Sequence, residues 1–458
     1  MRLFVRDRNF YKDLVILAIP IMLQNFITFA VSFADNVMVG SLGEYAISGV
    51  YVGNQIQMLL QFVVMGIQEG MSILATQYWG RKDAENIKHI VAVAFRICLA
   101  VGLFFTLVMV IVPEPILRLF TDDEQVVEEA LVYVRILCWS YALFSVSQIL
   151  ISAMRSVEQT KIGFYVSLMS LVVNVTLNYI LIFGKLGIEP MGVKGAAIAT
   201  LVSRLCELLL AAAYVLFADR KLIMRPRDFT RWNRTLAIDL AKYGSPVLMG
   251  QIVWAINNLG QSAIIGHFST EAVAAVSIAG MLNNMLFLIA RGLASGLGII
   301  TGKTIGAGEY EKMKRYAVTS QVIFLCLGIF LGVMTLLLMN PIISLYNINE
   351  ATIKVTRQFI IILAVTMVGR CYQGTCLAGL VKAGGDVSFV FKNDTIFVFG
   401  VVLPSALVAM HLFNAPAWVI YLCLQSDQIL KCFVAFFKIN SFNWMKNLTR
   451  SEMKQEYC

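Results

Sequence analysis

Residues 14–40 read LVILAIPIMLQNFITFAVSFADNVMVG, an apolar run that contains a single charged side chain, Asp35. A helix that spans a membrane needs about 20 consecutive apolar residues, and this run exceeds that length. It is also longer than the apolar core of a signal peptide, and no small-residue cleavage site follows it. The run therefore predicts the first membrane helix.

The same pattern continues along the chain. Of the 458 residues, 59% are apolar and only 14% are charged, whereas soluble domains have about 25% charged residues. The chain is therefore predicted to be an all-α integral membrane protein with twelve spanning helices. They are expected at roughly 14–39, 46–78, 90–112, 130–153, 162–183, 195–218, 243–266, 272–301, 316–340, 353–380, 387–410 and 417–437.

This composition excludes several function classes. The longest polar stretch, 219–242, is shorter than the ~50 residues of a separate soluble catalytic domain. The net charge of +9 is divided among short loops, which does not indicate a nucleic-acid partner. No metal-ligating cysteine spacing or convergent nucleophile and base is readable. We therefore expect neither an enzyme nor a cofactor.

An internal repeat divides the chain into halves. Sliding the sequence by 226 residues brings Pro20 onto Pro246, Gly66 onto Gly292 and Gly70 onto Gly296. Six helices in each half give parallel repeats, as in one class of secondary transporters. The expected parts are an N-terminal lobe (1–218), a basic cytoplasmic linker (219–242), a C-terminal lobe (243–440) and a cytoplasmic tail (441–458).

The loop cations set the expected orientation. The N-terminus (Arg2, Arg6, Arg8, Lys12) and the loops after even-numbered helices carry nearly all the Lys and Arg residues of the connections. Because such residues stay on the cytoplasmic side, both termini are expected in the cytoplasm. The chain is then a multi-pass protein of the plasma membrane.

Polar residues at membrane depth are costly unless they are paired or face water, so they are candidates for function. Asp35 is the foremost of them, because a carboxylate in a low-dielectric site can take up a proton or supply the charge of a cation site. The alternative is a carboxylate that reaches water near the outer helix end. Candidates for a substrate cavity at helical spacing are Gln24, Thr28, Ser32, Asn54, Gln57, Gln61, Gln251, Asn258 and Gln261. Arg204, Glu207, Arg291 and Arg370 are interpreted as interhelical pairs or side chains that reach the interface.

Several motifs together resemble those of the multidrug and toxic compound extrusion (MATE) transporters. They are ADNVMVG at 34–40, QYWGRKD at 77–83, NYILIFG at 178–184, GVKGAAIAT at 192–200 and GGD at 384–386. The resemblance covers nearly the whole chain and implies a V-shaped pair of six-helix lobes. It also implies export of bulky, often cationic organic compounds, driven by inward flow of Na⁺ or H⁺.

The resemblance further implies a coupling-cation site in the N-terminal lobe at Asp35, Asn174, Asn178 and Thr200, with Na⁺ as the metal ion to consider at Asp35. Members with a well-defined sodium site have an acidic residue where Asn178 stands, so the coupling ion stays open between Na⁺ and H⁺. Pro20 resembles the proline of the family's first helix, where a bend is linked to coupling.

Two other functions stay open. A flippase for lipid-linked oligosaccharides has a related fold, but such a protein has a strongly cationic cavity, whereas the amide stripes here favour neutral or cationic cargo. A membrane scaffold without transport is the second alternative. The expected partners are a small organic substrate and the lipid bilayer. We take a monomer as the expected state, although nothing in the sequence sets the oligomeric state.

Overall fold

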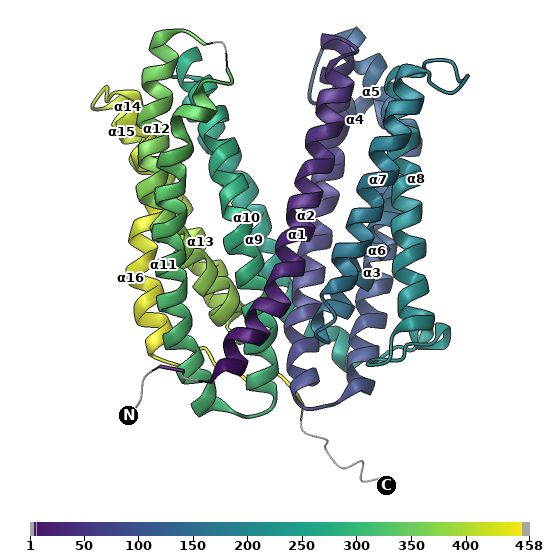
Figure 1. Ribbon diagram of the computed structural model, residues 1–458, viewed down its shortest axis with the longest axis vertical. Coiled ribbons are helices and arrows are strands. Elements are labelled where there is room, and N and C mark those ends of the chain that lie inside the picture. The colour runs from purple at the N-terminus through teal and green to yellow at the C-terminus, as the bar shows by residue number, and fades with distance from the viewer. Residues whose placement is uncertain (1–3, 6, 347, 451–458) are drawn as a thin grey trace. The chain divides into compact units, whose positions relative to one another are not determined.

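The computed structural model describes residues 4–5, 7–346 and 348–450, and no strand is present in these ranges (Figure 1). The long helices are α1 (Arg8–Gly40), α2 (Glu44–Gly80), α3 (Ala84–Ile111), α7 (Lys161–Phe183), α8 (Gly192–Ala213), α9 (Arg234–Gly266), α10 (Thr270–Gly306), α11 (Tyr310–Ile343) and α12 (Glu350–Gly369). The shorter ones are α4 (Pro113–Leu117), α5 (Glu124–Leu137), α6 (Ser140–Ser156), α13 (Val387–Phe397), α14 (Leu403–His411), α15 (Ala417–Leu424) and α16 (Asp427–Asn440). Short π-helices and a 3-10 helix are η1 (Tyr214–Ala218), η2 (Pro226–Thr230), η3 (Arg370–Gly374), η4 (Leu377–Lys382) and η5 (Val398–Val402).

The all-α membrane class is confirmed, while the number of spans differs from the expected twelve. Over the described residues, ten helices are long and apolar enough to cross a membrane, or eleven if α5 and α6, which meet at 52°, form one bent span. The helix expected at 243–266 lies in α9, which is 33 residues long but is not among the ten. Its amides at Gln251, Asn257, Asn258 and Gln261 lower its hydropathy.

Side chains at the helix starts satisfy backbone donors that have no partner within the helix. Asp83 accepts from the amide of Asn86 ahead of α3 at 3.1 Å. Asn349 accepts from the amide of Thr352 ahead of α12 at 2.7 Å. Local sequence therefore sets where these helices begin.

The described chain forms two compact units, whose limits differ from the expected lobes. One consists of residues up to Met22, 76–81 and the chain from Met249 onward, and the other of 23–75 and 82–248. The first part of α1 thus belongs with the C-terminal helices, and the first part of α9 belongs with the N-terminal helices. Helix packing, which the order of the helices in the sequence does not reveal, decides which unit each of these helix parts belongs to.

The segment 219–242, expected as a linker, packs within the second unit. Leu222 and Met224 are buried, and the side chain of Arg96 in α3 donates to the carbonyl of Phe229 at 2.9 Å. Asp219 accepts from the amides of the turn that follows it. The segment is therefore a folded part of its unit.

The 226-residue repeat reappears in the helix contacts. A Cβ added at Gly70 in α2 would lie 2.6 Å from the Cα of Gly244 in α9, and one added at Gly296 in α10 would lie 3.1 Å from the Cα of Ala18 in α1. Both pairs are related by the same offset, since 296 − 70 and 244 − 18 both equal 226. Small residues let helices approach closely in membranes, so the repeated glycines mark two equivalent helix crossings.

The segment expected as a tail is tied down as far as Arg450. The Trp444 side chain is fully buried and donates to the carbonyl of Ile439 at 2.9 Å. The amide of Leu448 donates to Gln77 Oε1 at 2.7 Å. The end of the expected tail, 451–458, and the expected cytoplasmic cations Arg2 and Arg6 lie outside the described residues.

Candidate functional site

The predicted cation-site residues of α1 and α7 are in contact within the second unit. The side-chain amide of Asn178 donates to Asp35 Oδ1 at 2.5 Å and to Asn174 Oδ1 at 3.2 Å. Asn174 and Asn178 are buried, and they share a face of α7 because they are one turn apart. The Asp35 carboxylate is thus held by a neutral amide.

The predicted Thr200 joins this group through a tyrosine. Thr200 of α8 lies beside the hydroxyl of Tyr133 in α5, and Asp35 is near enough to interact electrostatically with the same hydroxyl. The Tyr133 hydroxyl also donates to Asn54 Oδ1 of α2 at 3.3 Å. We call these six residues the Asp35 cluster: Asp35, Asn54, Tyr133, Asn174, Asn178 and Thr200.

Tyr133 was not predicted as a site residue from the sequence, because an aromatic residue in an amphipathic helix ordinarily indicates core packing. The glutamates and Arg135 around it on α5 gave no sign that its hydroxyl faces a carboxylate. Its partners come from three other helices, so nothing in its own stretch of sequence could have identified it.

The donor set of the cluster suits a proton or a small hard cation. Asn178 Oδ1 is buried and has no hydrogen-bond partner among the described residues, and it lies on the same side chain that holds Asp35. Carboxylate, amide and hydroxyl oxygens are ligands of hard cations. No group of three His, Cys, Asp or Glu side chains that could hold a metal ion occurs within the described ranges.

The nearby arginine is paired with another carboxylate. Arg204 of α8 forms an ion pair with Glu207 at 2.7 Å, and Ser147 and Gln148 of α6 donate to the same glutamate at 3.1 and 2.8 Å. Arg204 acts on Asp35 only through the electrostatic field. Within the described residues, Asp35 therefore forms no ion pair with an arginine.

The rest of the α1 stripe does not reach the cluster by hydrogen bonds. Gln24 is buried and accepts from Arg155 at 2.8 Å. The exposed hydroxyls of Thr28 and Ser32 donate to carbonyls of their own helix. Gln24 packs against Gly163 of α7, whereas Asp35 is the stripe residue for which the described chain shows a hydrogen bond to α7.

The remaining cavity candidates make few contacts. Gln57 Oε1 is buried without a hydrogen-bond partner among the described residues, and Gln61 and Gln251 are half-buried. Asn258 donates to the Trp254 carbonyl of its own helix at 3.0 Å, and Gln261 accepts from Gln425 at 3.4 Å. Gln251, Asn258 and Gln261 belong to the unit that contains α10. Their role in substrate binding stays a prediction.

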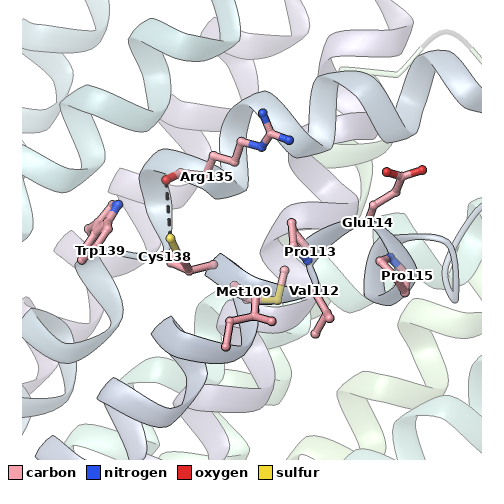
Figure 2. Close-up of a pocket in the computed structure, with 10 residues that line it drawn as sticks. Met109, Val112, Pro113, Glu114, Pro115, Arg135, Cys138 and Trp139 are labelled. Atoms are coloured by element: carbon pink, nitrogen blue, oxygen red, sulfur yellow. Dashed lines mark hydrogen bonds between the residues drawn. The ribbon is translucent and has the colours of Figure 1, made fainter.

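Figure 2 shows a pocket of about 550 Å³ at the junction of α3, α4 and α5. Its lining includes Met109, Pro113, Glu114 and Trp139, and Cys138 Sγ lies 3.5 Å from the carbonyl of Arg135. None of the predicted site residues lines it. The Asp35 cluster is therefore separate from this pocket.

The sequence profile of the MatE family matches residues 20–180 and 246–408, and the two matched segments begin 226 residues apart, the offset of the internal repeat. The chain belongs to the MatE family. The resemblance read from the motifs is thereby confirmed, and the two matches coincide with the two halves of the repeat.

Relatives with curated names extend over most of the chain. The probable multidrug resistance protein YoeA of Bacillus subtilis is 23% identical over 406 residues, which are 88% of this chain and 87% of the relative. The probable multidrug resistance protein NorM of Thermotoga maritima is 21% identical over 448 residues, which are 97% of this chain and 96% of the relative.

Solved MATE structures share the fold. A mutant of the Vibrio cholerae MATE transporter VcmN superposes with a TM-score of 0.86 at 17% identity, covering 95% of this chain and 98% of that one. A MOP superfamily transporter from Pyrococcus furiosus gives a TM-score of 0.85 at 19% identity, covering 94% of this chain and 96% of that one. At these identities the likeness concerns the fold alone.

Proposed function

We propose that the protein is a cation-coupled antiporter that exports organic compounds by alternating access. It acts as a monomer in the plasma membrane, with both termini in the cytoplasm. MatE membership and relatives named as multidrug resistance proteins support export. The observation that carries the coupling is the Asp35 carboxylate, which is held by the amide of Asn178 rather than by an arginine.

The proposed coupling step is an exchange at Asp35. A bound H⁺ or Na⁺ neutralises the carboxylate, and the free Asn178 carbonyl oxygen supplies a further ligand for Na⁺. Without the cation, a charged Asp35 in low dielectric is stabilised by hydrogen bonds and by cationic groups nearby. A cation gradient shifts the balance between these two states from one side of the membrane to the other, and this shift drives the cycle.

Pro20 is the proposed bend of α1. It lies inside the continuous helix, between Ala18 and Met22, which contact the repeat glycines Gly296 and Gly292 of α10. Proline lacks the backbone donor of a regular helix, so bending is cheapest at that point. Asp35 lies four turns beyond it on the same helix, and we propose that its neutralisation is coupled to this bend.

Reconstituted vesicles with an imposed gradient of H⁺ or of Na⁺ test the proposal. Wild-type protein should move a fluorescent organic cation against its gradient with one of the two ions. We expect Asp35→Asn to lower this gradient-driven transport at least tenfold, because the variant cannot exchange a charge. Asp122→Asn, the same change at an exposed carboxylate, is the matched control and should transport normally. Ordinary transport by Asp35→Asn would remove Asp35 from the mechanism.

A further inference from the structure

Two arginines lie deep inside spanning helices of the unit that contains α10 to α16. Arg291 is roughly 20 residues from the start and 15 from the end of the span Glu271–Gly306, or about 30 and 22 Å at 1.5 Å per residue. Arg370 is roughly 12 residues from the end of the span Glu350–Lys382, or about 18 Å. Both arginines therefore lie in the interior of their spans, several turns from the helix ends.

Neither arginine forms an ion pair with any described residue. Arg370 donates to Asn284 Oδ1 at 3.4 Å, and its guanidinium carbon lies 4.1 Å from the centre of the Phe287 ring. Arg291 is exposed and close enough to Arg370 for the two charges to repel. The Phe287 ring covers one face of the Arg370 guanidinium, and the hydrogen bond to Asn284 uses one of its five in-plane N–H donors.

The carboxylates of this region are already engaged. Asp394 and Asp427 both pair with the buried Lys431, at 2.9 and 3.2 Å, and Gln428 also donates to Asp427 at 2.8 Å. Asp427 acts on Arg370 only through the electrostatic field. Lys431 and the two arginines carry three positive charges, and the two aspartates carry two negative charges. One positive charge is therefore left in excess.

An uncompensated positive charge at membrane depth indicates a ligand that supplies the missing negative charge, because charged groups there are paired or face water. The arginine fork matches carboxylate and phosphate oxygens, which can accept two parallel hydrogen bonds. Asn284 is exposed on α10. While its Oδ1 accepts from Arg370, its side-chain NH2 group is a further donor for the ligand. An organic molecule could also stack on the exposed part of Phe287.

We propose that Arg291, Arg370 and Asn284 bind an anionic group, carboxylate or phosphate, of the transported compound. The inference rests on the proposed function and extends its cargo to organic compounds that carry such a group. It also revises the expectation of neutral or cationic cargo. That expectation was based on the amide stripes, and the two arginines were interpreted as members of interhelical pairs or as side chains that reach the interface.

Binding to the detergent-solubilised full chain tests the site without any gradient. The probes are a rhodamine dye with a free carboxylate and the methyl ester of the same dye, measured by fluorescence anisotropy. We expect Arg291→Gln to weaken binding of the carboxylate dye about tenfold and that of the ester less than twofold. Arg118→Gln, at an exposed arginine paired with Glu114 and Glu124, is the matched control. Retained ester binding shows that the variants are folded.

A second arm distinguishes the source of the anion. A short-chain phosphatidic acid and the matching diacylglycerol compete with the ester dye, and displacement by the phosphate lipid alone, lost in Arg291→Gln, assigns the site to lipid phosphate. Arg370→Lys keeps the charge but removes the fork, so it should weaken binding of the preferred anion without affecting the probes that lack an anionic group. Equal effects on probes with and without an anionic group in both arms, or no effect in either, would overturn the proposal.

The two proposals fail in distinguishable ways. If the wild-type protein binds the carboxylate dye through Arg291 but exports neither dye under any gradient, the proposed function fails and the anion site stands. If the ester is exported with a gradient but the arginine variants bind every probe as the wild type does, the anion site fails and the transport function stands.

Discussion

Asp35 differs from the other carboxylates near it in the chemistry of its partner. Glu207 is neutralised by Arg204 and receives two further hydrogen bonds, so its charge is fixed. Asp35 receives its hydrogen bond from an amide that carries no charge. A carboxylate with a neutral partner keeps its attraction for a cation, and for this reason Asp35, not Glu207, is the exchange site that we propose.

Asn178 should decide which cation binds. Replacing it by aspartate, Asn178→Asp, places a second carboxylate beside Asp35, and two carboxylates favour a metal ion by adding a charged oxygen ligand. We expect transport by the variant to be stimulated by Na⁺ several-fold more than transport by the wild type at constant pH. The measurement is dye efflux from vesicles as the Na⁺ concentration is varied.

Asn443→Asp is the matched control, because Asn443 is exposed beyond the end of α16 and belongs neither to the Asp35 cluster nor to the cavity candidates. It should leave the response to Na⁺ unchanged. If Asn178→Asp transports at the wild-type rate with an unchanged response to Na⁺, the amide of Asn178 does not take part in ion selection.

Three described helices are divided between the two compact units: α1, α9 and α2, of which only residues 76–80 belong to the first unit. The helices α1 and α9 share a pattern in how they are divided. Each is a continuous helix with an internal proline, Pro20 or Pro246, and each passes from one unit to the other just after that proline, at Met22 or Leu248. Close contact with a glycine of α10 or α2 holds each helix at this point. The glycines therefore fix the crossings while the prolines permit bending.

The crossing of α2 and α9 should not tolerate a methyl group. Gly70→Ala puts a Cβ 2.6 Å from the Gly244 backbone, and overpacking of this kind costs about 1–3 kcal/mol. Gly250→Ala in α9, where nothing lies within 4 Å, is the control and should be neutral or slightly stabilising because alanine is the better helix former. Thermal unfolding in detergent measures both, and equal melting temperatures would show that the crossing relaxes at little cost.

At the scale of the whole chain, the last described segment is bound to regions far away in sequence. Lys446 pairs with Asp386 at 2.8 Å, and Lys438 pairs with the same carboxylate at 2.7 Å. Burial alone would raise the pKa of Asp386, but the two lysines hold the pKa of this carboxyl below its ordinary value. The ion pairs thus help to hold residues 441–450 in place.

This pairing predicts how stability depends on pH. Because the folded-state pKa of Asp386 is lowered, its stabilisation is fully present above the unfolded pKa of about 3.9 and is lost as the pH falls through the lower folded-state value. At pH 7 we expect Asp386→Asn to cost about 1–3 kcal/mol, and the difference from the wild type should shrink below pH 4. Unfolding midpoints from pH 7 to 3 measure this, and a difference that stays constant with pH would contradict it.

Much of the fold could be predicted because it follows from local chemistry. Backbone groups in lipid must be satisfied within the helix, so long apolar runs predict spanning helices, and the 226-residue repeat predicts two equivalent halves. Asp35 and the asparagine pair of α7 are recognisable because polar residues at helical spacing share a face. The span expected at 130–153 could not be predicted as a bent pair, because the break between α5 and α6 involves no proline or glycine.

The sequence by itself therefore determined the membrane class, the repeat and the polar residues that merit attention. Only the tertiary structure decided their partners: Asn178 for Asp35, Glu207 for Arg204, Tyr133 beside Thr200 and, among the described residues, no carboxylate for Arg291. It also decided that α1 and α9 are each divided between the two units. The reason is physical, since helical periodicity acts over a few residues, whereas the pairing of charges depends on which helices, distant in sequence, are brought into contact.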